Sequence, residues 1–427
     1  MDVNYKNQKR YNTSKLPIRQ PIYLTWLIWL LSKIVVGSKK HKIERIDMDG
    51  LKPPYIILSN HMSFIDFELL ALGTYPQRMN NVVNIDGYYM RPWLMEWIGA
   101  ICTRKFTTDF ALVKSILHVL KNHGDVLTMY PEARYSPCGA TSYLPDSIGK
   151  LIKMARVPVV AVVHRGNYLH SPVWNVKNKR KVPMHTTIQK IITADEAREL
   201  SVDELNLRVK SALVYDEYKY QLENDIKITE KYRAEGMHKI LYKCPHCEKE
   251  FKMTTEGAVL RCTACSYEWE LCENGQLIST SGESYFTHVP SWYEWQREMV
   301  KREIEDGTYY FEDTVDVYSM PACYKFPHLG KATLTHSIEN GFVLEGNYRD
   351  KPYRIQRTPL QSNSLHVEYE FPHIKKRFDC VDISTENDSF YCYPSKENVV
   401  TKLALATEEL YKIKYEKIRT KKETSIK

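Results

Sequence analysis

Short apolar runs alternate with amphipathic stretches from about residue 43 to residue 194, and this alternation restricts the fold more than any other feature. Two of the stretches, 64–72 and 110–122, carry apolar residues at helical spacing. The runs with the composition of β-strands are 55–58, 81–85, 125–130, 158–163 and 186–192. Because strands and helices alternate, the sequence predicts an α/β layer fold over this region.

The rest of the 427-residue chain differs in character, and its length predicts two or three domains at roughly 150 residues each. A capping box from Ser201 to Glu204 opens a helix that leads into a charged, Tyr-rich connector. Further strands are expected at 331–335, 341–348, 353–357, 365–371, 376–382 and 389–393, before a final helix at 397–412. The predicted segments are a membrane-associating stretch (1–42), the α/β domain (43–213), a helical linker (214–240), a cysteine module (241–275) and a β-rich module (285–427).

The first 42 residues contain one apolar stretch, from Tyr23 to Gly37, which is interrupted by Lys33. The stretch is shorter than the roughly 20 residues that a simple helical span needs. Basic residues flank it on both sides, at Lys9, Arg10, Lys15, Arg19, Lys39, Lys40 and Lys42. This pattern is typical of a helix that lies in the interface of an anionic membrane, and the alternative is a core helix packed on the domain.

Net charge and cysteine content restrict the classes of partner and the cellular compartment that fit this chain. The formal net charge of +8 comes from 60 basic and 52 acidic residues spread along the chain, so the basic bias is mild. An anionic membrane surface or a phosphate-bearing ligand fits this charge, and nucleic acid is not expected. Ten cysteines are too few for a disulfide scaffold of this length, which favours reduced thiols and a cytosolic face. Together with the apolar stretch, this predicts a peripheral or monotopic protein on the cytoplasmic face of a membrane.

Two CxxC pairs, separated by fourteen residues, form a strong local motif. The four cysteines are Cys244, Cys247, Cys262 and Cys265. Two thiolate pairs on two turns suit a tetrahedral zinc site of the zinc-ribbon type, with redox disulfides as the alternative. Because four sulfurs complete the coordination shell, we expect this zinc to be structural and not catalytic. His246 and Cys272 lie close by and are not needed as ligands.

The main candidate for chemistry is the segment from Asn60 to Asp66, which follows an apolar strand. Ligands of α/β layers usually bind where strands end. Acyl transfer to an alcohol needs a base for the hydroxyl proton, and an imidazole such as His61 titrates near neutrality. Asp66 suits the partner role, accepting the other ring N–H, if His61 lies in the loop and Asp66 in the first helical turn. The structural alternative is a capping box from Ser63 to Asp66 beside an ordinary buried histidine.

Later segments, in the same order, give the chain a resemblance to the glycerolipid acyltransferase family that includes lysophosphatidic acid acyltransferases. Residues 60–66 match the family pattern Asn-His-x-Ser-x-x-Asp in full. The family's second block, an apolar segment ending in Arg, is similar to residues 99–104. Its third block, Phe-Pro-Glu-Gly-Thr-Arg-Ser, is similar to residues 130–136, and its fourth, an apolar strand opening with Pro, is similar to residues 157–162.

The third block departs from the family pattern at two positions. Ala133 stands in place of the Gly, and Tyr135 occupies the family's Arg position, whereas Arg134 comes one place earlier. The guanidinium of Arg134 still suits the phosphate of an acceptor. The resemblance implies catalysis by His61 and Asp66, with substrate contacts from Asn60, Ser63, Arg104, Glu132 and Arg134.

The resemblance also implies a mixed sheet with flanking helices and direct transfer of a fatty acyl group without an acyl-enzyme. The implied donor is acyl-CoA or acyl carrier protein, and the implied acceptor is 1-acylglycerol 3-phosphate or a related hydroxyl compound of phospholipid synthesis. Cys102 and Cys138 are then packing residues. Two alternatives stay open. One is a catalytically altered membrane scaffold that binds partners through its last two modules, and the other is a hydrolase, although Ser63 lacks the Gly-x-Ser-x-Gly pattern.

The segment 285–427 resembles pleckstrin-homology or related barrels in its order of strands and a terminal helix, which is an architectural similarity. Its cluster of Trp292, Tyr293 and Trp295 suits either insertion at a membrane surface or packing in a core. Core packing is the more common outcome for such clusters.

Overall fold

The computed structural model describes residues 3, 10–37, 41–107, 109–370 and 378–426, and the chain divides into two compact units. The α/β unit comprises residues 12–103 and 109–230. The C-terminal unit comprises residues 1–11, 104–108 and 231–427. The predicted membrane contacts of Lys9, Lys39 and Lys40 lie outside the described residues.

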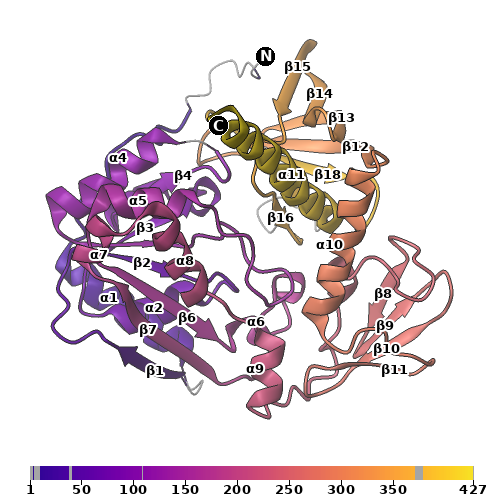
Figure 1. The fold of residues 1–427 in the computed structure, drawn as a ribbon, viewed down its shortest axis with the longest axis horizontal. Coiled ribbons are helices and arrows are strands. Elements are labelled where there is room, and N and C mark those ends of the chain that lie inside the picture. The colour runs from indigo at the N-terminus through magenta and orange to yellow at the C-terminus, as the bar shows by residue number, and fades with distance from the viewer. Residues whose placement is uncertain (1–2, 4–9, 38–40, 108, 371–377, 427) are drawn as a thin grey trace. The chain divides into compact units, whose positions relative to one another are not determined.

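A seven-stranded sheet forms the centre of the α/β unit, with the strand order β1-β7-β6-β2-β5-β3-β4 (Figure 1). Its strands are β1 (His41–Ile46), β2 (Tyr55–Ser59), β3 (Met79–Asn84), β4 (Ile101–Thr103), β5 (Val126–Met129), β6 (Val159–Arg165) and β7 (Met184–Ile192). The five strands from β6 to β4 run parallel, whereas β7 is antiparallel to β6, and β1 is parallel to β7. The carboxyl ends of five strands therefore share one edge of the sheet with the amino ends of β7 and β1.

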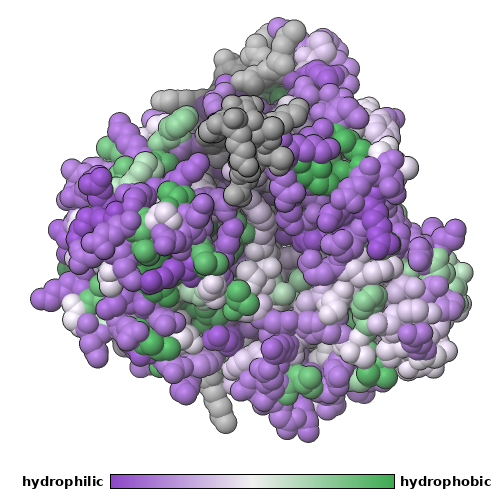
Figure 2. Space-filling view, viewed as in Figure 1, coloured by the Kyte–Doolittle hydropathy of each residue, from purple (hydrophilic) through white to green (hydrophobic). Residues whose placement is uncertain are grey.

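Helices cover this sheet, and they are α1 (Ile22–Val36), α2 (Asp66–Thr74), α3 (Pro92–Trp97), α4 (Phe110–His118), α5 (Ser147–Ala155), α6 (Asn167–His170), α7 (Ala194–Glu199), α8 (Val202–Ala212) and α9 (Glu217–Glu223). Helix α2 packs on β6 and β7, where its Leu70 and Ala71 join a core with Tyr55, Ile57 and Val160. All five residues of β2 are buried, as expected for a central parallel strand with both faces covered. The face in Figure 2 is largely hydrophilic, with scattered hydrophobic residues.

Helix α1 has an apolar side that packs and an apolar side that does not. It packs against α2, and its Val36 joins Ile65, Leu69 and Met184 in a small core. The exposed large apolar residues of the helix are Ile22, Tyr23, Trp26, Leu27, Leu31, Ile34 and Val35. In the part of the chain that the structure describes, no helix is both long enough and apolar enough to cross a membrane.

The C-terminal unit begins with the cysteine module, a four-stranded antiparallel sheet in the order β11-β10-β9-β8. Its strands are β8 (Met253–Glu256), β9 (Val259–Cys262), β10 (Glu268–Leu271) and β11 (Leu277–Ser279). Helix α10 (Val289–Glu305) packs on this sheet through Trp292, which contacts the ring of Trp269 and donates its indole N–H to the Lys243 carbonyl at 2.9 Å.

The second sheet of this unit has seven antiparallel strands in the order β15-β14-β13-β12-β18-β17-β16. The strands are β12 (Tyr310–Ser319), β13 (His328–Ser337), β14 (Gly341–Tyr348), β15 (Lys351–Arg357), β16 (His366–Glu368), β17 (Cys380–Ser384) and β18 (Ser389–Pro394). Two meanders, β12 to β15 and β16 to β18, join because the first strand of one pairs with the last strand of the other. Helix α11 (Val400–Ile426) follows and packs against α10, where Arg297 donates to Glu408 at 2.7 Å and to Glu409 at 3.1 Å.

Several sequence predictions differ from the observed elements. The helical linker at 214–240 is largely wrong, because only Glu217–Glu223 is α-helical there and the connector is turn-rich. Among the elements that were not predicted are strands β1, β4 and β12, the four strands of the cysteine module, and helices α5, α7 and α10. Strand β4 is short, and α10 has polar residues at many positions. Core packing is confirmed for Trp292 and Tyr293, which are fully or almost fully buried. Residues 371–377, at the ends of two predicted strands, lie outside the described residues.

Candidate functional site

Three of the four sequence blocks meet at one edge of the sheet in the α/β unit. The segment from Asn60 to Asp66 follows β2, residues 130–136 follow β5, and the fourth block forms β6. Since β5 and β6 flank β2 and run parallel to it, the first and third blocks leave the sheet side by side. The Ser136 N–H donates to the His61 carbonyl at 2.8 Å, which ties these two loops together.

His61 and Asp66 are brought into direct contact. His61 lies in the loop after β2, Asp66 is the first residue of α2, and Nδ1 of His61 is 3.0 Å from Oδ2 of Asp66. The Asp66 side chain is 1% exposed, whereas the His61 side chain is 16% exposed. The carboxylate is therefore shielded from water while part of the imidazole remains accessible.

The remaining bonds to the Asp66 carboxylate come from its own loop and from a distant residue. The Met62 N–H donates at 2.7 Å and the Ser63 N–H at 3.1 Å, so the carboxylate also holds the start of α2. The Asn167 amide donates to Oδ1 at 2.6 Å from α6. Asn167 was not identified from the sequence, although its position just after β6 places it at the same sheet edge.

The charge state of Asp66 follows from these contacts. Burial by itself raises the pKa of this carboxyl. The hydrogen bond and charge of His61, together with the Met62 N–H, lower the pKa by more than burial raises it. The net result is an Asp66 pKa below its ordinary value, so the group is an anion at neutral pH. An ionised partner on Nδ1 orients the ring and leaves Nε2 as the basic atom.

Two tyrosines enclose the imidazole ring. The ring of Tyr130 stacks on His61 with centroids 4.0 Å apart and planes 18° apart. The ring of Tyr135 also lies 4.0 Å from His61 with a tilt of 36°, and it contacts Phe64 at 5.0 Å. Tyr135 stands where the acyltransferase pattern has Arg. The rings restrict the orientation of His61, and electron-rich ring faces favour an imidazolium.

Asn60 and Ser63 have structural bonds at this site. The Asn60 side chain donates to the His164 carbonyl at 2.9 Å and accepts from the His164 N–H at 2.8 Å, joining the ends of β2 and β6. Ser63 is buried, and its hydroxyl lies 3.4 Å from Oδ1 of Asp66, a weaker contact than the one from its N–H. Substrate contacts for either residue stay a prediction.

Glu132 and Arg134, in the third block, are both buried. The Glu132 carboxyl accepts from the Tyr215 hydroxyl at 3.0 Å and from the Ser142 N–H at 3.0 Å. Burial raises the pKa of Glu132 to about 7, with these bonds and Arg134 acting in the opposite direction. Their predicted substrate roles are untested, and the observed contacts of Glu132 brace the loop. Ala133 has a φ of 53°, in the left-handed region that the family's Gly adopts at low cost.

Arg104 belongs to the C-terminal unit, although it directly follows β4 in sequence. Its guanidinium donates to the Met320 carbonyl at 3.2 Å and to the Ser389 hydroxyl at 3.1 Å, and the residue is 4% exposed. These contacts lie within the C-terminal unit, whereas His61 and Asp66 belong to the α/β unit. Its substrate contact, which the resemblance implies, stays a prediction.

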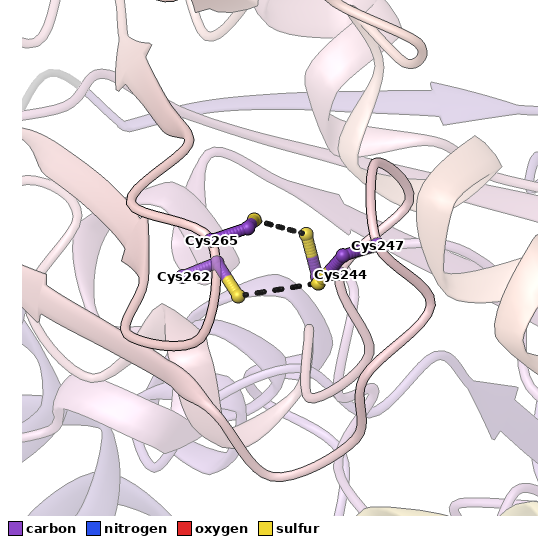
Figure 3. A group of neighbouring side chains, drawn as sticks. All are labelled: Cys244, Cys247, Cys262 and Cys265. Carbon is purple, nitrogen blue, oxygen red and sulfur yellow. Dashed lines mark hydrogen bonds between the residues drawn. The ribbon is translucent and has the colours of Figure 1, made fainter.

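The four cysteines of the two CxxC pairs form one cluster, with their sulfurs within 4.8 Å of one another (Figure 3). Sγ of Cys244 is 3.8 Å from Sγ of Cys265, and Sγ of Cys247 is 3.7 Å from Sγ of Cys262. Four thiolates about 2.3 Å from a central zinc lie about 3.8 Å apart in a tetrahedron, so this donor set fits zinc.

The two turns that carry these cysteines have the same geometry. Glu248 and Ser266, each directly following a CxxC, have φ of 56° and 61°, and their N–H groups donate back to the carbonyls of Cys244 and Cys262. His246 stacks on Tyr267, with ring centroids 4.3 Å apart. The cluster can therefore hold a metal ion through sulfur alone.

Comparisons with known proteins give limited similarity. No protein-family profile matches the chain. No curated protein matches it either. Among solved structures, the chain is similar to the 1-acyl-sn-glycerophosphate (LPA) acyltransferase PlsC from Thermotoga maritima, with 17% sequence identity and a TM-score of 0.36. That similarity covers 44% of this chain and 78% of the other. A similarity at this level assigns neither a fold nor an activity to the chain.

Proposed function

We propose that the chain is an O-acyltransferase that transfers a fatty acyl group from acyl-CoA or acyl carrier protein to the hydroxyl of 1-acylglycerol 3-phosphate or a related acceptor. The observation that carries this proposal is the contact of 3.0 Å between His61 Nδ1 and the buried Asp66 carboxylate. A partly exposed imidazole with an ionised partner is the arrangement that activates a hydroxyl group in acyl transfer.

The chemistry follows from the orientation of the ring. With the Nδ1–H donated to Asp66, Nε2 takes the proton of the acceptor hydroxyl as its oxygen bonds to the thioester carbonyl carbon. The carbon–sulfur bond then breaks, and the imidazolium returns the proton to the departing thiolate. Tyr130 and Tyr135, on the two faces of the ring, stabilise the imidazolium that forms between these steps.

Membrane association belongs to the same proposal. The exposed apolar side of α1, which includes Trp26, Leu31 and Ile34, suits insertion at the level of the headgroups and the upper acyl chains. Lys15 and Lys42, exposed in the same unit, add basic groups that favour anionic lipid. Such a helix keeps an enzyme next to lipid acceptors, and we place the protein on the cytoplasmic face of a membrane.

Two further assignments complete the proposal. A structural zinc ion bound by Cys244, Cys247, Cys262 and Cys265 would hold the two turns of the cysteine module together. We propose that the seven-stranded sheet and its final helix α11 form a pleckstrin-homology-like module. Catalysis is assigned to the α/β unit alone.

The test is an acyl-transfer assay of the full chain with defined donors and acceptors. Long-chain acyl-CoA and acyl carrier protein are offered with 1-acylglycerol 3-phosphate, glycerol 3-phosphate and other lysophospholipids. Loss of the general base is expected to lower the rate of His61→Ala by about 10² to 10⁴. The matched control is His328→Ala, which removes an exposed histidine from β13. No product from folded, zinc-loaded wild-type protein would contradict the proposal and favour the scaffold alternative.

A further inference from the structure

An open pocket of about 460 Å³ lies at the sheet edge that carries the candidate catalytic residues. Its lining includes His41 and Lys42 from the start of β1, Met184 and His185 from the start of β7, and Tyr220 and Asn224 from α9 and its end. The amino ends of β1 and β7 share this edge with the carboxyl ends of β2 and β6, because β7 runs antiparallel to β6. A pocket of this volume is within the usual range for small ligands.

Hydrogen bonds connect the pocket to the loop of His61. The His41 Nε2 atom lies 2.8 Å from the Thr186 hydroxyl, and the same hydroxyl lies 2.9 Å from Nδ1 of His164. The backbone of His164 is in turn bonded in both directions to the side chain of Asn60, the neighbour of His61. Thr186 and His164 therefore link the pocket to Asn60, the residue next to the candidate catalytic histidine.

The charges around the pocket favour an anion. Lys42 is exposed, and Arg165 at the end of β6 donates to Thr187 and lies over the Tyr220 ring at 5.9 Å. Glu44 opposes this charge, 3.2 Å from Nε2 of His185. Glu217, another nearby carboxyl, does not oppose the positive charge, because burial raises its pKa to about 8 and keeps it mainly neutral at pH 7. Lys42 and the two histidines line the pocket, whereas Arg165 and Glu44 contact it through Tyr220 and His185.

The two histidines add donors that respond to a ligand. Burial, with the charge of His185, lowers the pKa of His41 to about 4, and burial with Arg165 also lowers the pKa of His185. Both rings are therefore mainly neutral in the empty pocket, where Lys42 is another like charge beside His185. An anion placed between them would favour their protonated forms and gain charge-assisted hydrogen bonds.

We infer that this pocket binds a phosphate group of one of the two substrates, the acyl acceptor or the acyl carrier. The inference rests on the proposed acyl-transfer function. It is strengthened by the third block, where Tyr135, at the position of the Arg in the family pattern, packs on His61. Lys42, Arg165 and the two histidines then supply phosphate donors at the other end of the sheet edge, in addition to Arg134 of the third block.

The experiment titrates the full chain with glycerol 3-phosphate and, separately, with coenzyme A by calorimetry. Wild type and His61→Ala are expected to bind one of these probes equally, whereas Lys42→Met and Arg165→Gln bind it at least tenfold more weakly. The matched control is Lys150→Met, an identical charge change at an exposed position of α5. Because Lys42 is exposed, its substitution tests the pocket without disturbing the core.

The kinetic arms identify the source of the phosphate. A raised KM for the acceptor alone in Lys42→Met assigns the pocket to the acceptor phosphate, and a raised KM for the donor alone assigns it to the carrier. Wild-type protein that binds neither probe, or pocket variants that bind like Lys150→Met, would overturn the inference even if acyl transfer is observed. Binding without any acyl transfer would retain the pocket and contradict the proposed reaction.

Discussion

Asn167 and Asp66 are joined by a hydrogen bond of 2.6 Å, although 101 positions separate them in the sequence. The bond links α6, which follows β6, to the first turn of α2, which follows the loop of β2. Asn167 thereby occupies the carboxylate oxygen that the His61 contact does not use. The candidate catalytic pair is therefore held at both carboxylate oxygens, by His61 at Oδ2 and by Asn167 at Oδ1.

Asn167→Ala is expected to lower kcat about ten- to one-hundredfold, because a hydrogen bond to a buried charge is worth about 1.5–3 kcal/mol. Loss of the bond also raises the pKa of Asp66, so the acid limb of the kcat/KM profile should move to higher pH. Asn347→Ala, at an exposed position of β14, is the control and should change neither quantity. An unchanged pH profile in Asn167→Ala would show that Asn167 only contributes to folding.

Tyr135→Ala is expected to lower kcat several-fold, up to about thirtyfold, because a cation–π contact contributes about 0.5–2 kcal/mol to an imidazolium. Tyr135→Phe keeps the ring over His61 and should retain nearly wild-type activity. Steady-state kinetics of the two variants separate the ring from the hydroxyl. Equal loss in both variants would mean that the hydroxyl, and not the stacked face, is what the reaction uses.

Ala133→Gly is expected to stabilise the protein by up to about 1 kcal/mol. Ala133 has a φ of 53°, and the left-handed region costs a residue with a Cβ about 1–2 kcal/mol, part of which glycine loses again through its greater unfolded-state entropy. Urea unfolding measures the difference. A clear destabilisation would mean that the Ala133 methyl group makes packing contacts that outweigh the backbone strain.

Glu217 makes the α/β unit less stable as the pH rises. Its folded pKa is raised to about 8, above the ordinary value of about 4.3. Between these two pH values the folded state binds a proton that the unfolded state has released. Stability should therefore fall with rising pH across this window, by up to about 1.4 kcal/mol per unit for this group. Glu217→Gln should flatten the slope in urea unfolding at pH 5 to 8, and an unchanged slope would rule out this group as its source.

Zinc removal is expected to unfold the cysteine module, because metal binding supplies about 10–16 kcal/mol to comparable small sites. Purified protein should contain one zinc per chain by elemental analysis, and Cys262→Ser should contain much less. Cys272→Ser is the matched control, because Cys272 is outside the four-sulfur cluster. Full zinc content in Cys262→Ser would contradict the four-cysteine site.

Local patterns in the sequence predicted much of the fold. The strand β2 and the capping box at Ser201 were found within one residue of their observed places, because alternation and capping depend on neighbours along the chain. The parallel order of β6, β2 and β5 could not be predicted, because it depends on how distant strands pair. Helix α10 was not predicted because its buried residues contact two different partners, the cysteine module and α11, and so do not form one apolar stripe at helical spacing.

The sequence by itself determined the residue types and spacings of this protein: His61 and Asp66 five positions apart in one short segment, and four cysteines in two CxxC pairs. The partners in each group are separated by few residues or lie on adjacent turns, so the local chain geometry brings them close. Only the tertiary structure decided that Asn167 holds Asp66, that Tyr130 and Tyr135 enclose His61, and that Arg104 bonds within the other unit. These contacts join segments that are far apart in the chain, and sheet pairing and side-chain packing select them over the many alternatives that composition and spacing leave equal.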